Sequence, residues 1–274
     1  MPELLILNST QSKSEAIERL AQEKGYRVKT CSLVEDALSW VDLRKLHALL
    51  VPFDTKIETQ LKLADALWRK NPSAIFGLYT LEEISTDEKN AARLSGAEIF
   101  SGDAGLNHLG ILLTTSANAK LHKMSIMVVE DLESPRDIIC AYVEGLGDYV
   151  VEGKASAKEA MQTLEDEPEK FSCIMTDIRM PEIDGKEFIN YIRKHPSLLH
   201  LPVIVLTAYG TMDTLVDCLK EGATGFLAKP PKKIDLLREL ARAQRVVQGL
   251  ASPRLATHEE AEALRNLLAD KGFY

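Results

Sequence analysis

Five polar residues each end or directly follow a short apolar run, and their types suggest one shared site. They are Glu130, Asp131, Asp177, Thr207 and Lys229. Carboxylates gathered within a few ångströms raise one another's pKa values or bind a cation. An all-oxygen cluster with no nearby His or Cys suits Mg²⁺ better than Zn²⁺. The residue types therefore predict a magnesium site that includes Asp177, which indicates phosphoryl chemistry.

The apolar runs that position these residues recur along the second half of the chain. They cover residues 126–129, 149–151, 173–175, 203–206 and 225–228, and segments of helical period separate them. Runs of Val, Ile, Leu and Met without strict alternation are typical of parallel strands that are buried on both faces and connected by right-handed crossover helices. Such a doubly wound sheet binds ligands at the carboxyl ends of its strands. All five polar residues are therefore expected at one edge of the sheet.

The first half repeats this rhythm, with apolar runs at residues 4–7, 26–30, 48–51, 75–79 and 98–100. We interpret the chain as an internal duplication. The expected counterparts are Asn8 and Ser9 for the acidic pair, Pro52 or Phe53 for Asp177, Thr80 for Thr207, Phe100 for Phe226, and Asp103 for Lys229. Because this half lacks the nucleophile and the metal carboxylates, we expect no phosphorylation there. Asp54 is the one alternative acceptor.

These patterns predict an α/β protein with two doubly wound domains, each built on a five-stranded parallel sheet, and a C-terminal helical extension. The predicted domains are residues 1–117 and 124–249, with a linker at residues 118–123 and the extension at residues 250–274. In the extension, Ser252 and Pro253 break the chain, and residues 257–260 form a capping box that opens an amphipathic helix. That helix is expected to pack on its own chain or, alternatively, to contact a second copy or another partner.

Composition and charge limit the classes of partner. The chain has 274 residues, 45% of them hydrophobic, which is enough for two buried cores. Its net charge of −8 argues against nucleic acid as a partner. No apolar segment approaches the roughly 20 residues that cross a bilayer, and the N-terminus lacks a charged leader. We therefore expect a cytoplasmic protein without membrane insertion. The cysteines lie far apart and are expected to be reduced core residues; they are Cys31, Cys140, Cys173 and Cys218.

The second half also carries a series of short motifs. In chain order they are Glu130-Asp131, Thr176-Asp177, Met180-Pro181, Asp184-Gly185, Leu206-Thr207-Ala208-Tyr209-Gly210, Gly222-Ala223, Phe226 and Lys229-Pro230. With these motifs, residues 124 to about 247 resemble the receiver domain of bacterial two-component response regulators. The stretch from Thr207 to Pro230 is most similar to receivers of the nitrogen-regulator type. The resemblance implies a flavodoxin-like fold and makes the first half a pseudo-receiver domain.

The resemblance also implies a role for each site residue. Asp177 would accept a phosphoryl group from a sensor histidine kinase or a phosphotransfer protein. The metal, Mg²⁺, would be held by Asp177, Glu130, Asp131 and the backbone carbonyl of Arg179, and no other cofactor is expected. Lys229 would pair with Asp177 when the site is empty and with a phosphoryl oxygen when it is filled. The peptide bond between Lys229 and Pro230 would be cis, although the following Pro231 departs from the aromatic residue common in the family.

A switch is expected to involve Thr207 and Phe226. A phosphoryl group adds close to two negative charges and three acceptor oxygens, so the Thr207 hydroxyl can move inward to donate a hydrogen bond. The resemblance implies that Phe226 then turns into the vacated space and remodels the surface of residues 215–220 and 234–240. We expect this surface to bind a downstream protein target, because no catalytic or DNA-binding segment follows in the sequence.

Two other functions remain open from the sequence. The first is a structural scaffold whose receiver pocket is intact but unused, acting through protein contacts that could include a homodimer. The second is a metal-dependent phosphohydrolase of similar fold. That enzyme would need a second catalytic carboxylate soon after its nucleophile, and Arg179 occupies this position. The leading interpretation is therefore a signalling protein without a separate enzymatic output domain.

Overall fold

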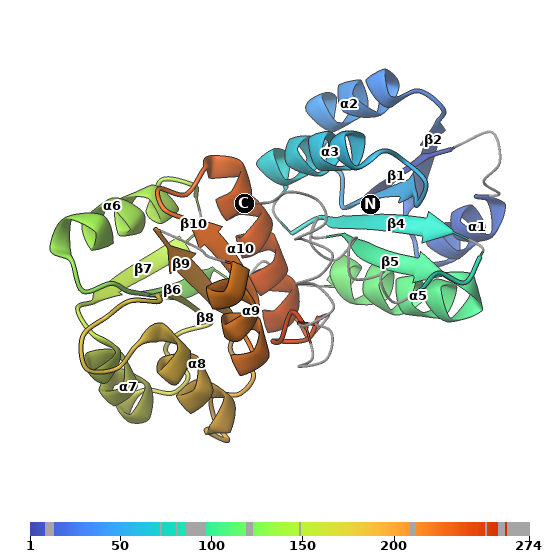
Figure 1. The fold of residues 1–274 in the computed structure, drawn as a ribbon. Coiled ribbons are helices and arrows are strands. Elements are labelled where there is room, and N and C mark those ends of the chain that lie inside the picture. The colour runs from blue at the N-terminus through green and yellow to red at the C-terminus, as the bar shows by residue number, and fades with distance from the viewer. Residues whose placement is uncertain are drawn as a thin grey trace. The chain divides into compact units, whose positions relative to one another are not determined.

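The computed structural model describes residues 1–8, 14–71, 73–80, 82–85, 97–118, 123–147, 149–208, 212–249, 251–256 and 261. It contains two compact units, Met1–Lys120 and Leu121–Tyr274 (Figure 1). Most of the predicted linker lies outside the described residues, as do the expected capping box at residues 257–260 and the helix after it, apart from Ala261.

The first unit is a parallel sheet covered by helices. Its strands are β1 (Glu3–Leu7), β2 (Arg27–Cys31), β3 (Ala48–Pro52), β4 (Ile75–Thr80) and β5 (Glu98–Ser101). The described helices are α1 (Glu15–Glu23), α2 (Val34–Leu43), α3 (Ile57–Lys70) and α5 (Gly102–Asn118). The sheet has the order β2-β1-β3-β4-β5, and every neighbouring pair is parallel.

The second unit repeats this architecture. Its strands are β6 (Met124–Val129), β7 (Tyr149–Lys154), β8 (Cys173–Asp177), β9 (Val203–Thr207) and β10 (Gly225–Ala228). Its helices are α6 (Glu133–Glu144), α7 (Ala157–Asp166), α8 (Gly185–Lys194), α9 (Met212–Glu221) and α10 (Lys233–Val247). The sheet order β10-β9-β8-β6-β7, read from the other edge, matches that of the first unit. The prediction of two doubly wound parallel sheets is confirmed.

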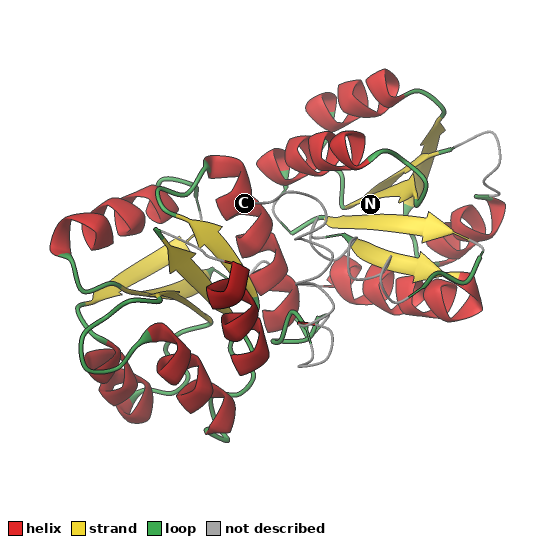
Figure 2. Cartoon of the chain, viewed as in Figure 1, coloured by secondary structure: helices red, strands yellow, loops and turns green. Residues whose placement is uncertain are grey.

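Burial explains why continuous apolar runs form these strands. Helices cover both faces of each sheet (Figure 2), so a central strand has no exposed side. All five residues of β3 and all five of β8 are buried. The edge strand β2 is half exposed and carries charged residues instead. None of the helices in the described part of the chain has the length and apolar character that a bilayer crossing requires.

The four cysteines are free thiols in two different environments. Cys173 and Cys218 are buried, and burial raises the pKa of both thiols, that of Cys218 to about 12. Cys31 and Cys140 are only partly buried. Cys140 on α6 packs against the core of the second unit. The expectation of a core position is wrong only for Cys31, which ends the edge strand β2.

Helix α8 begins with a capping box directly beside the end of β8. The Asp184 carboxylate accepts from the Glu187 backbone N–H at 2.8 Å, and the Glu187 carboxylate accepts from the Asp184 N–H at 3.1 Å. Gly185 then passes so close to Asp177 that an added Cβ would lie 2.2 Å from the Asp177 carbonyl oxygen. A glycine is needed here because the helix starts in contact with the backbone that carries the Asp177 side chain.

We expect Asp184→Ala to lower the free energy of unfolding of the second unit by about 1 kcal/mol, because the Glu187 N–H loses its acceptor. Asp184→Asn, which keeps a side-chain oxygen, is the matched control and should cost much less. Urea unfolding followed by circular dichroism measures the change. Both tryptophans, Trp40 and Trp68, lie in the first unit, so tryptophan emission should report an unchanged transition. Equal losses in the alanine and asparagine variants would contradict the capping role.

Candidate functional site

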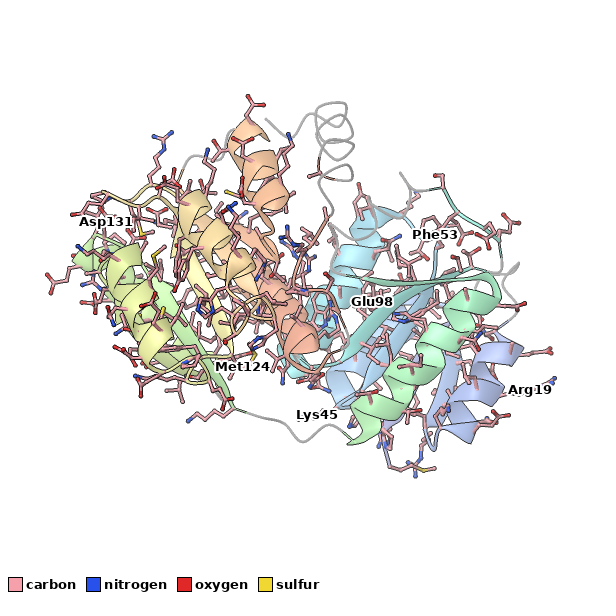
Figure 3. All side chains as sticks on the ribbon, turned by 90° about the horizontal axis from the view of Figure 1, so that it is seen from below. Arg19, Lys45, Phe53, Glu98, Met124 and Asp131 are labelled. Atoms are coloured by element: carbon pink, nitrogen blue, oxygen red, sulfur yellow. The ribbon has the colours of Figure 1, made fainter. Side chains whose placement is uncertain are left out.

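The acidic residues meet at the carboxyl ends of two neighbouring strands. Glu130 directly follows β6, and Asp177 is the last residue of β8. Each of Glu130, Asp131 and Asp177 offers a carboxylate oxygen, and these oxygens lie within 4.8 Å of one another. In Figure 3, Met124 labels the start of β6, and Asp131 labels the turn that follows the end of this strand. The order of the sheet reverses beside β6, where doubly wound folds form their ligand-binding crevice.

The main chain of Glu130 is fixed on both sides. Its N–H donates to the Lys154 carbonyl at 3.0 Å, and its carbonyl accepts from Arg136 Nη1 at 2.9 Å. The Arg136 side chain lies over Gly153, where a Cβ would come within 3.0 Å of its Cγ and Cδ atoms. The sequence reasoning missed Arg136. Its position on the first turn after the acidic pair was the only signal in the sequence.

Asp177 is 9% exposed, and its carboxylate has two donors. Oδ1 accepts from the Ile178 backbone N–H at 2.8 Å and lies 3.0 Å from Lys229 Nζ. The Thr176 hydroxyl donates to the Asp177 carbonyl at 3.0 Å. Both donors contact the same oxygen, so they fix the orientation of the carboxylate within the cluster.

Lys229 follows β10 and reaches into the acidic cluster. Its backbone N–H donates to the Thr207 carbonyl at 2.7 Å, and the peptide bond between Lys229 and Pro230 is cis. Its ammonium group forms ion pairs with both Glu130 and Asp177. One ammonium offsets only one of three carboxylate charges, so the ionised cluster retains the charge that a divalent cation would balance. The donor set, carboxylates and carbonyl oxygens, fits Mg²⁺.

A surface hollow of about 610 Å³ lies beside the acidic cluster. Its lining includes Asp131, Ile178, Arg179, Met180, Pro181, Asp184, Lys186 and Thr214. Arg179, whose backbone carbonyl is the expected metal ligand, is exposed in the loop two residues after Asp177. Of the three clustered carboxylates, that of Asp131 lines this hollow.

The two expected switch residues lie on neighbouring strands near the cluster. Thr207 ends β9 and pairs in register with Ala228, while Phe226 on β10 pairs with Val205. Both side chains are half-buried. The motif residues Tyr209 and Gly210 lie outside the described residues.

Strand register identifies the counterparts of these residues in the first unit. The Asn8 N–H donates to the Cys31 carbonyl at 2.8 Å, just as the Glu130 N–H donates to Lys154, so Asn8 takes the place of Glu130. Pro52 pairs with Tyr79, whereas Asp177 pairs with Leu206. Pro52, rather than Phe53, therefore stands at the acceptor position. The alternative acceptor Asp54 is exposed two residues further along the loop.

Register also corrects two predicted counterparts. Ser101 pairs with Thr80, and Ala228 pairs with Thr207, so Gly102 rather than Asp103 takes the place of Lys229. By the same pairing, Phe100 takes the place of Leu227 and not that of Phe226. The expectation was wrong by one residue, and one residue in a strand turns the side chain to the opposite face. Accordingly, Phe100 is 2% exposed, whereas Phe226 is half-buried.

A tyrosine that the sequence reasoning missed closes the same place in the first unit. Tyr79 occupies the position of Leu206 and is 2% exposed. Its hydroxyl donates to the Leu7 carbonyl at 2.9 Å and lies 3.4 Å from Asn8 Oδ1. Because it bonds to the end of β1, it occupies the sheet edge that the carboxylates use in the second unit. An aromatic residue directly before Thr80 was the signal in the sequence.

The family match lies within the second unit. Residues 126–241 match the response regulator receiver domain family. An uncharacterised 14.6 kDa protein of Leptolyngbya boryana is 36% identical over 118 residues, which is 43% of this chain and 88% of that protein. The transcriptional regulatory protein ZraR of Klebsiella oxytoca is 40% identical over 110 residues, 39% of this chain but only 23% of that protein. Among solved structures, the chemotaxis protein CheY4 of Vibrio cholerae is 28% identical and has a TM-score of 0.41; the match covers 44% of this chain and 99% of that one.

The matched residues contain both acidic strand ends, the cis-proline loop, strands β7 to β10 and all but the first two residues of β6. The first unit has the same sheet order with altered residues at the corresponding strand ends. The chain therefore belongs to the response regulator receiver family.

Proposed function

We propose that the protein is the phosphorylatable component of a two-component phosphorelay, in which a sensor histidine kinase or a phosphotransfer protein phosphorylates Asp177 in the cytoplasm. The observation that carries this proposal is the environment of Asp177. Its carboxylate ends β8 beside two further carboxylates, accepts the Ile178 N–H and contacts the Lys229 ammonium. This environment fixes a carboxylate, a group that acts as a nucleophile in phosphoryl transfer, beside a hollow that Asp131 and Ile178 line.

The chemical step transfers a phosphoryl group between two side chains. An Asp177 carboxylate oxygen attacks the phosphorus of a phosphohistidine on the partner and forms the new O–P bond. The P–N bond breaks, and its electron pair remains on the imidazole nitrogen, which gains a proton from solvent. Lys229 exchanges its contact with Asp177 for one with a phosphoryl oxygen. Its ammonium group then offsets the negative charge of the transferred phosphoryl group.

The residues that would hold Mg²⁺ are Glu130, Asp131 and Asp177, with the Arg179 backbone carbonyl. When bound, this ion would offset the repulsion between the carboxylates and the incoming phosphoryl oxygens. Arg136 contributes by holding the carbonyl of Glu130, which fixes the direction in which the acidic pair leaves β6. The Lys229 ammonium and the Ile178 N–H are the protein's own groups that stabilise negative charge at Asp177.

The output is a change in the surface made by α9, β10 and α10. The Thr207 hydroxyl turns toward the phosphoryl oxygens and donates to them, and the half-buried Phe226 turns into the space that it leaves. We propose that a downstream protein binds the altered surface. The first unit cannot take part in this chemistry, because Pro52 and Tyr79 occupy the corresponding places, and its role is to bind a partner or a second copy of the chain.

Incubation with Mg²⁺ and acetyl phosphate should add one phosphoryl group that is stable in acid and labile in base, measured by intact mass. Asp177→Asn should abolish this addition, because no nucleophile remains, and chelation of Mg²⁺ with EDTA should suppress it. Asp54→Asn, which changes the exposed aspartate of the first unit, is the matched control and should be labelled normally. Labelling of Asp177→Asn would contradict the proposal, as would catalytic turnover of small phosphate esters.

Thr207→Val should still accept the phosphoryl group but should lose the switch. A hydrogen bond to a charged group is worth about 1.5–3 kcal/mol, and valine cannot donate one. Hydrogen–deuterium exchange of residues 212–228 before and after phosphorylation measures the response. Thr207→Ser keeps the hydroxyl and is the control that should respond as the parent protein does. An equal response in the valine variant would show that Thr207 does not transmit the signal.

A further inference from the structure

The chain after α10 returns to pack against the second unit. Residues 251–256 lie beside the loop that leads from α9 into β10. The Leu255 backbone N–H donates to the Ala223 carbonyl at 2.9 Å, and the Pro253 carbonyl accepts from both Arg193 and Thr224. Arg254 also lies against Gly222, where an added Cβ would come within 2.8 Å of its Nη1 atom. We call residues 251–256 the C-terminal latch.

Arg193 holds the latch through a guanidinium group that contacts several carbonyls. Nε donates to the Gly222 carbonyl and Nη1 to the Leu201 carbonyl, both at 2.8 Å, while Nη2 donates to the Pro253 carbonyl at 3.0 Å. Burial, together with the nearby charge of Arg254, lowers the pKa of Arg193 to about 10, so it is still a cation at neutral pH. Carbonyl oxygens on three separate segments therefore converge on one half-buried guanidinium group, and the latch supplies one of these oxygens.

Thr224 joins the latch to β9, β10 and α10. It is 1% exposed, and its hydroxyl accepts from the Val203 N–H at 2.8 Å while donating to the Pro253 carbonyl. Its own carbonyl accepts from Arg242 of α10 at 3.3 Å. Thr224 immediately precedes β10 and stands two residues before Phe226. Only Gly225 separates Thr224 from Phe226, so a backbone movement at Phe226 reaches Thr224 through one intervening residue.

We infer that docking of the C-terminal latch is linked to the state of Asp177, with the latch docked when Asp177 is unphosphorylated and released when it is phosphorylated. This inference rests on the proposed function. The docked latch accompanies the unphosphorylated arrangement, in which Lys229 pairs with Asp177 and Phe226 is only half-buried. A turn of Phe226 and the accompanying shift of α9 displace Ala223 and Thr224, which are two of the latch's partners.

Linkage requires the effect to run in both directions. If phosphorylation weakens docking by some factor, loss of docking must favour the phosphorylated conformation by the same factor at equilibrium. The latch thus acts as an intramolecular ligand of the unphosphorylated conformation. It shifts the population of the two conformations only by the difference between its affinities for them.

Hydrogen–deuterium exchange of the Leu255 amide in the full chain tests the first direction. Phosphorylation with acetyl phosphate, verified by intact mass, should speed this exchange about fivefold or more, the lower end of typical couplings between sites. The Ala160 amide, bonded to the Ser156 carbonyl at the start of α7, is the internal control and should not change. A phosphorylated protein whose Leu255 amide keeps its protection would overturn the latch but leave the proposed function standing. A protein that gains no phosphoryl group would overturn both.

A pair of variants tests the reverse direction. Leu255→Pro removes the N–H that donates to Ala223, whereas Leu255→Ala removes the side chain and keeps that donor. Beryllofluoride is an equilibrium analogue of the phosphoryl group. Its dissociation constant, measured by titration, should be at least about fivefold lower for the proline variant than for the alanine variant. Equal affinities in two folded variants would overturn the inference. Binding to neither variant nor to the parent chain would instead count against the phosphoacceptor site itself.

Discussion

Repulsion among Glu130, Asp131 and Asp177 is the constraint around which the second unit is arranged. Carboxylates whose oxygens lie within 4.8 Å of one another repel when charged, and the Lys229 ammonium and the Ile178 N–H offset this repulsion. Lys229 reaches the cluster because its backbone N–H is bonded to the Thr207 carbonyl at the end of β9. The beginning of α8, where only glycine fits, presses on the Asp177 backbone from the other side. The strand ends, the loop at Lys229 and the start of α8 thus all position groups that contact the carboxylate cluster.

The same constraint explains why the first unit can keep the fold without the chemistry. Asn8 and Pro52 are neutral, so the first sheet edge has no repulsion to offset at these positions. A tyrosine hydroxyl then bonds to the strand end that a carboxylate would otherwise follow. The sheet order is unaffected, because it depends on apolar runs buried on both faces rather than on the residues at the strand ends. Fold and function are therefore separable within one chain.

Periodicity and composition were enough to predict the sheets but not every position in them. Strand β10 begins and ends where its apolar run does, whereas β7 continues to Lys154 because charged residues on an edge strand can pair with one another, as Lys154 does with Glu152. Because both halves have a phenylalanine near the end of the last strand, the sequence favoured Phe100 as the equivalent of Phe226. The strand register shows that this alignment is wrong by one residue. Arg136 and Arg193 act on backbone carbonyls, and no pattern of residue types encodes such contacts.

The neutral edge of the first unit has a consequence for the whole chain. Among the described residues, its strand ends carry no carboxylate cluster, whereas the second unit gathers three carboxylates whose oxygens lie within 4.8 Å of one another. A cation that binds only the folded cluster stabilises the fold that holds it. The duplication therefore places a cation-dependent contribution to stability on the unit that carries Asp177, and the described strand ends of the first unit offer no matching contribution.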